Sequence, residues 1–219
     1  MEANFREVIK NFLTDENLSV KERKERFELA WDIWKSIDKI MSDLEDKLIV
    51  GLYEKIKKSR EFGDYVVIYK GSEQGISVFR PEWTEESGHS LLFYALGIEG
   101  DSKVARHLAI GIKKHDEETP FVGNLEENNL PEELKCHLDS VFTILNEYGT
   151  YHFEDFFHNL WVTWIAKSEL LFTSELFLDL GPEEAVEKIF YHFLTLKNET
   201  EKYISDFIKV YKERFLNFE

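Results

Sequence analysis

Apolar residues recur at intervals of three or four between residues 19 and 58. They are Phe27, Trp31, Trp34, Ile37, Met41, Leu44, Leu48, Leu52 and Ile56. This spacing places them along one side of an α-helix. Ser19 and Glu22 have the S-x-x-E form of a capping box, which satisfies the free N–H groups at a helix start. The pattern predicts one amphipathic helix of roughly 40 residues, about 60 Å long.

After Gly63 the pattern becomes that of strands. Four segments are rich in β-branched and aromatic residues or alternate apolar residues with small and polar ones. They are residues 65–70, 75–80, 89–98 and 104–113. Short polar links separate them, as in antiparallel meanders. We therefore expect about four antiparallel strands with one covered face, and we expect the N-terminal apolar stripe to cover it.

Helix-start signals return in the second half of the chain. Pro131-Glu132-Glu133 and Gly181-Pro182-Glu183-Glu184 place a proline and two acids in a first helical turn, where both are favoured. Residues 151–180 fit either a helix or a strand. The sequence predicts an α+β protein whose antiparallel sheet is flanked by long amphipathic helices from both termini. It is divided into a helical segment, 1–62, and an α+β domain, 63–219, which form one compact unit.

Composition narrows the class of protein. The 219 residues are 43% hydrophobic and 15% aromatic, enough to build a core. The single Cys136 excludes an internal disulfide and fits a reducing compartment. The N-terminus lacks the apolar stretch of a signal peptide, and no run of apolar residues is long enough to cross a membrane. We expect a cytoplasmic protein with no membrane contact.

Charge is distributed very unevenly. The net charge is −16, and residues 115–184 alone contain 16 Asp+Glu against 2 Lys+Arg, a net of −14. Several of these acids are interleaved with aromatic residues, a combination that protein recognition surfaces use. The candidate partner-binding residues are Glu126, Glu127, Glu132, Glu133, Glu147, Glu154 and Asp155. A solvated acidic face and a divalent-cation site are the alternatives.

One polar constellation fits a metal site. His152, Glu154, Asp155 and His158 include i,i+3 and i,i+4 pairs if the segment is helical. One helix supplies two ligands, whereas a metal site needs three or more. The sequence predicts no cofactor and no catalytic residue. The alternative function is a metal-dependent hydrolase, such as a nuclease-related one.

A second group of residues lies near the predicted sheet. Arg80, Trp83, Arg106 and His107 are candidates for a secondary pocket. A structural role for Trp83 is the alternative.

Four stretches carry a family resemblance. They are Gly75–Trp83, Leu91–Tyr94, Ile110–Lys114 and Leu160–Trp164. In this order they resemble the region downstream of the nuclease-like core in some prokaryotic PD-(D/E)XK superfamily proteins, over residues 63–215. The acid–acid–lysine motif of that family is not found here. The resemblance implies an accessory or recognition part without the catalytic centre.

Together these observations favour a non-enzymatic binding or regulatory protein. Its acidic, aromatic-rich surface would engage a basic partner protein, such as one that handles nucleic acid, and would not bind nucleic acid directly. Imitation of the phosphate backbone is a special case of this hypothesis. The N-terminal helices would either pack on the sheet or form a homodimer, and the sequence leaves both open.

Overall fold

The computed structural model describes residues 10–13, 17–71, 75–85, 90–99, 107–114, 131–150, 161–166 and 181–216. The chain divides into two compact units, Met1–Asp43 and Leu44–Glu219. The long helix α2, Val20–Lys58, begins in the first unit and ends in the second.

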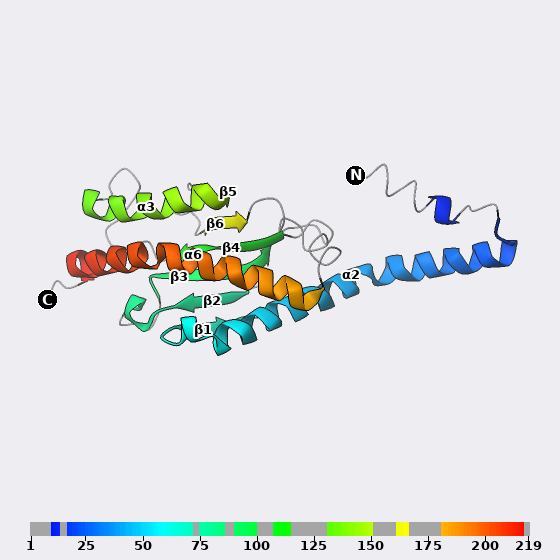
Figure 1. Cartoon of the computed structure of the whole chain (residues 1–219), viewed down its shortest axis with the longest axis horizontal. Helices are drawn as coiled ribbons and strands as arrows, with labels where there is room; N and C mark the ends of the chain where they lie inside the picture. Colours follow the sequence, from blue (N-terminus) through cyan, green and yellow to red (C-terminus); the bar gives the residue numbers. More distant parts are fainter. Residues whose placement is uncertain are drawn as a thin grey trace. The chain divides into compact units, whose positions relative to one another are not determined.

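The second unit combines one antiparallel sheet with long helices (Figure 1). Its strands are β1 Val66–Tyr69, β2 Ile76–Phe79, β3 Leu92–Glu99, β4 His107–Lys114, β5 Gly149–Thr150 and β6 Trp161–Ala166. Its helical elements after α2 are η1 Arg60–Phe62, η2 Pro81–Trp83, α3 Glu132–Tyr148, α6 Pro182–Tyr211 and the π-helical turn η4 Lys212–Leu216. The strand order is β1-β2-β3-β4-β6-β5. The predicted α+β architecture and its four-strand meander are confirmed, and β6 shows that part of the ambiguous segment is a strand.

The start of α2 has the predicted capping box. The Ser19 backbone N–H and hydroxyl both donate to the Glu22 carboxylate, at 2.8 and 2.7 Å, and the Glu22 N–H donates to Ser19 Oγ at 3.3 Å. The hydrogen bonds from Ser19 lower the pKa of Glu22 below its ordinary value. Reciprocal bonds of this kind fix where a helix begins.

Both faces of the sheet's centre are buried, which corrects the expectation of a single covered face. Residues 91–98 and 76–79 are buried without interruption, although successive strand residues point to opposite faces. One face carries large side chains such as Tyr94, Leu96 and Ile110. The other contains small residues in register, where Ala95 lies opposite both Ser77 and Gly111. These small residues were not recognised as core positions because they carry little apolar surface.

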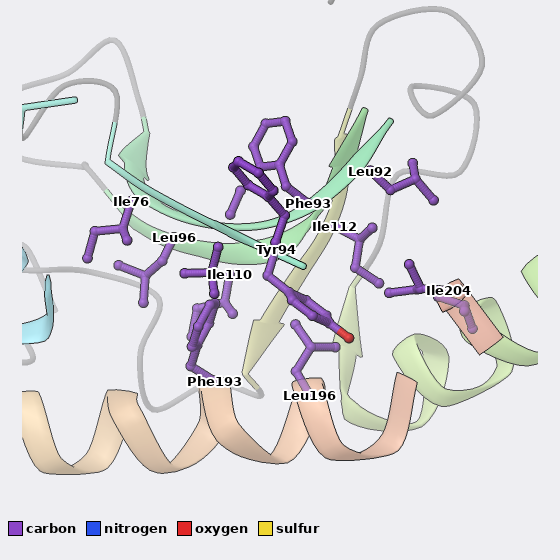
Figure 2. Packing of buried hydrophobic residues seen from close by; sticks show 14 of the residues in the cluster. Ile76, Leu92, Phe93, Tyr94, Leu96, Ile110, Ile112, Phe193, Leu196 and Ile204 are labelled. Carbon is purple, nitrogen blue, oxygen red and sulfur yellow. The ribbon is translucent and has the colours of Figure 1, made fainter. Parts of the chain in front are cut away.

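Helix α6 provides much of the cover for the large face. Figure 2 shows Tyr94 directed toward Leu196, with Phe193 beneath the sheet and Phe93 on the opposite side. The rings of Tyr94 and Phe193 meet edge to face with centroids 6.1 Å apart, a favoured geometry for aromatic pairs.

The last part of the N-terminal stripe belongs to the core of the second unit. Leu48, Ile49, Leu52 and Ile56 of α2 are fully buried in the core. Phe27, Trp31 and Trp34 of the same stripe are 58%, 50% and 72% exposed. The apolar stripe of α2 therefore changes from exposed to buried along the helix.

The turn between β1 and β2 depends on two glycines with positive φ, Gly71 at 93° and Gly75 at 71°. The Gly75 N–H donates to Gly71 O at 2.8 Å. A Cβ at Gly75 would lie 2.0 Å from the Leu96 carbonyl oxygen on β3, whereas no atom of the described residues lies within 4 Å of a Cβ at Gly71. Glycine is therefore needed at position 75 for two reasons: the backbone has a positive φ, and a Cβ would collide with β3.

These two glycines give a matched pair of variants. Gly71→Ala should lower the free energy of unfolding by about 1–2 kcal/mol, the cost of a left-handed backbone at a residue with a Cβ. Gly75→Ala adds a collision with backbone and should cost at least about 3 kcal/mol. Urea denaturation of both variants tests this, and equal losses would contradict the steric argument.

Candidate functional site

The acidic candidates that the structure describes lie at the start of α3. Glu132 and Glu133 are both exposed in its first turn. The Arg214 guanidinium of η4 donates to Glu133 Oε2 at 3.2 Å. Because both partners are largely exposed, this ion pair adds little to stability. The acidic pair is therefore accessible, and one of its members already binds a guanidinium group.

The structure describes the remaining acidic and metal candidates only in part. Glu147 lies in α3, but its side chain is outside the described part of the chain. Outside the described residues altogether are Glu126, Glu127, His152, Glu154, Asp155 and His158. Among the residues that are described, no group of three or more His, Cys, Asp or Glu side chains has the arrangement to hold a metal ion.

Arg80, a candidate for the secondary pocket, lies in an ionic cluster between the β2–η2 corner and α6. Its Nε donates to Glu201 Oε1 at 2.6 Å, and its NH1 donates to Glu82 Oε1 at 2.9 Å. The guanidinium carbon also lies 5.2 Å from the centroid of the Tyr65 ring. We call Tyr65, Arg80, Glu82, Lys197 and Glu201 the Glu201 cluster.

Lys197 completes this cluster from one turn earlier on α6. It is only 8% exposed, and its Nζ lies 3.1 Å from Glu201 Oε2. The same ammonium group lies 5.4 and 5.9 Å from the ring centroids of Tyr65 and Phe62. A nearly buried lysine requires such partners, because burial of an unpaired charge is costly.

The protonation states of the Glu201 cluster follow from burial and hydrogen bonding. Burial and a hydrogen bond to the Glu201 carboxylate raise the pKa of Tyr65. Burial alone would raise the pKa of Glu201, but hydrogen bonds from Tyr65 and Lys197, with the nearby positive charges, lower it overall. Hydrogen bonds to Glu82 and Tyr65 raise the pKa of Arg80. The cluster consists of a neutral phenol among mutually satisfied charges, an arrangement that stabilises the contact between α6 and the sheet.

Trp83 belongs to the core beside this cluster. It is 1% exposed, its Nε1 donates to Ser205 Oγ at 3.2 Å, and its ring lies 5.6 Å from that of Tyr94. His107 is the first residue of β4, but its side chain is not among those described, and Arg106 lies outside the described residues. The structure thus brings Arg80 and Trp83 to one corner of the sheet.

A shallow groove of about 420 Å³ lies where the end of α2 meets the start of α6. Its lining residues are Lys47, Gly51, Glu54, Lys55, Lys58, Glu183, Val186 and Glu187. The helices approach closely at Gly51, where a Cβ would lie 2.9 Å from Val186 Cγ2. Lys55 forms an ion pair with Glu187 across the groove. The mixed charges of this lining select no particular ligand chemistry.

The first half of α2 carries most of the exposed large apolar side chains among the described residues. It contains Val20, Phe27, Leu29, Trp31, Ile33, Trp34 and Ile40, which are 77%, 58%, 55%, 50%, 50%, 72% and 44% exposed. We call these residues the N-terminal apolar face. The sequence places Phe27, Trp31 and Trp34 in the N-terminal apolar stripe and leaves open whether they pack on the sheet or form a homodimer. Exposed apolar side chains gathered in this way are typical of an interaction site.

Comparison with known proteins gives no relative. No protein-family model, no curated protein and no solved structure matches this chain. The resemblance to PD-(D/E)XK proteins therefore stays a prediction. In the part of the chain that the structure describes, no helix combines the length and the apolar character needed to span a membrane.

The Glu201 cluster predicts a pH-dependent stability. Glu201→Gln should lower the free energy of unfolding at neutral pH by about 2 kcal/mol, because charged partners lose a charged acceptor. Since folding lowers the pKa of Glu201 below its ordinary value of 4.5, this stabilisation is present above that pH. It is lost as the pH falls through the folded-state pKa.

Denaturation of both proteins across this pH range measures the effect. The difference between wild type and Glu201→Gln should shrink steadily below about pH 4.5. The exposed Glu61 provides the control, and Glu61→Gln should change stability little at any pH. A difference for Glu201→Gln that is independent of pH would show that packing, not charge, holds this corner.

Proposed function

We propose that the protein is a non-enzymatic binding or regulatory protein that engages a basic partner protein through its acidic segment, residues 115–184. The observation that carries this proposal is the net charge of −14 in that segment, while the rest of the chain nearly balances its charges. A concentrated negative field attracts a basic surface and accelerates encounter with it. The partner chemistry that fits best is a Lys/Arg-rich protein, such as one that handles nucleic acid.

Acidic side chains are exposed in the part of the acidic segment that the structure describes. Glu132 and Glu133 are exposed on α3, while Leu134 and Leu138 of the same helix are buried. The helix therefore holds the acids outward by burying its opposite side. The contact of Glu133 with Arg214 is the kind of guanidinium contact that a basic partner would provide.

Charge reversal tests the proposal. A variant with Glu126, Glu127, Glu132 and Glu133 replaced by Lys should lose binding to basic partners by about tenfold or more. Capture from the native host, with identification by mass spectrometry, should recover a basic protein with wild type, and this capture should weaken as salt rises.

A matched control separates the local surface from total charge. Glu54, Glu61, Asp64 and Glu213 are exposed acids outside the acidic segment, and their replacement by Lys changes the net charge equally. The control should retain the partner. Equal loss in both variants, or capture that does not depend on salt, would contradict a specific acidic surface.

The alternative, a metal-dependent hydrolase, has a separate test. Thermal unfolding in the presence of Mn²⁺, Mg²⁺, Zn²⁺ or Ca²⁺ should leave the midpoint unchanged if the acidic segment serves protein binding. A metal-dependent rise of several degrees that disappears in His152→Ala and His158→Ala would favour the metal site instead.

A further inference from the structure

We propose that the N-terminal apolar face binds the same face of a second copy of this chain, with the two α2 helices antiparallel and centred near Ala30 and Trp31. This proposal does not rest on the acidic segment. It starts from the exposure of the face: Phe27 and Trp34, one turn on either side of Ala30, are 58% and 72% exposed. Exposure of two such rings to water is unfavourable unless a partner covers them.

The spacing within the face fits a helical partner. Val20, Phe27 and Trp34 of this face, and Met41 after it, recur every seven residues, the period with which helices pair side by side. Ala30 lies between the aromatic residues, and a small side chain at a helix crossing lets the two backbones approach. In an antiparallel pair centred here, the large side chains before Ala30 in one copy meet those after it in the other.

The charges at the two ends of the face favour the antiparallel orientation. Residues 20–26 carry four basic and two acidic side chains, whereas residues 38–46 carry four acidic and one basic. Glu45 is only 2% exposed, and the net charges of the two ends remain opposite in sign when it is not counted. Antiparallel pairing places each basic end beside the acidic end of the other copy, whereas parallel pairing places like charges together. The helix dipoles favour the same orientation.

The polar side of the helix argues against a lipid partner. Lys21, Lys24, Lys35 and Lys39 are balanced there by Glu25, Glu28, Asp32 and Asp43. Two i,i+4 pairs are formed, Lys21–Glu25 at 3.9 Å and Lys24–Glu28 at 3.7 Å. Helices that lie on membranes instead carry an excess of Lys and Arg on this side.

The available area approaches that of the smaller specific dimers. A buried aromatic side chain contributes about 150–250 Å², and Phe27, Trp31 and Trp34 are half exposed or more. Six such rings from two copies therefore offer roughly 500–900 Å². The aliphatic residues of the face in both copies bring the total toward the ~1,200 Å² of the smaller specific interfaces.

The oligomeric state of the full chain tests the proposal. Sedimentation analysis over a dilution series should show a dimer that dissociates on dilution. Phe27→Glu with Trp34→Glu should raise the dimer dissociation constant by about a hundredfold or more, because it places like charges at the centre of the contact. Tyr191 of α6 is an equally exposed aromatic residue, 67% exposed, and Tyr191→Glu should leave the dimer intact.

Folding and orientation have their own controls. The thermal midpoint of the Phe27→Glu/Trp34→Glu variant should stay close to that of wild type, since neither side chain is in the core. In a Cys136→Ser background, chains with Val20→Cys should form disulfides with chains carrying Met41→Cys but not with one another. The antiparallel pair separates the two residues at position 20 by about 30 Å.

Three results would overturn the proposal. A monomer at every concentration would exclude the contact, and disulfides between two Val20→Cys chains would exclude the antiparallel orientation. Binding of a monomer to phosphatidylserine vesicles, with a blue shift of tryptophan fluorescence that the Phe27→Glu/Trp34→Glu variant lacks, would assign the face to a lipid surface instead.

Discussion

The fold depends on the packing of α6 against the large-residue face of the sheet. Tyr94, in the middle of β3, connects the two layers. Its ring meets Phe193, while its buried hydroxyl lies 3.1 Å from Thr200 Oγ1. Burial raises the pKa of Tyr94 well above its ordinary value, so the phenol stays neutral. A fully buried aromatic residue with a satisfied polar end fixes the position of the helix along the sheet as well as its distance from it.

Polar contacts extend this packing along α6. The Glu201 cluster lies beside Trp83 at the β2–η2 corner, and further along the chain Lys212 Nζ donates to the Glu82 carbonyl oxygen at 2.8 Å. Burial lowers the pKa of Lys212. These contacts attach the end of the chain to the η2 turn. Apolar burial provides most of the stability here, and the charged groups add directional contacts that fix how the helix lies.

The sequence predicts the helices and strands of this fold better than it predicts which of them pack together. The capping box at Ser19, the meander and the proline-acid start of α6 were all identified because each depends on neighbours in the sequence. The burial of both sheet faces was missed, because Ala95 and Gly111 contribute few apolar atoms. Of the Glu201 cluster the sequence singled out only Arg80, because Lys197 and Glu201 resemble an ordinary i,i+4 surface pair. Contacts between distant segments leave no periodic signal.

In the first half of α2, the apolar periodicity of the sequence predicts a helix but does not predict what its apolar side contacts. A helix of 39 residues is about 58 Å long, whereas a strand of eight residues extends roughly 26 Å. A sheet of this length can cover only part of an apolar stripe that continues along the whole helix. Leu48, Leu52 and Ile56 are buried in the core, whereas Phe27, Trp31 and Trp34 are half exposed or more. The aromatic residues of the N-terminal apolar face, and the opposite charges at its two ends, favour a partner.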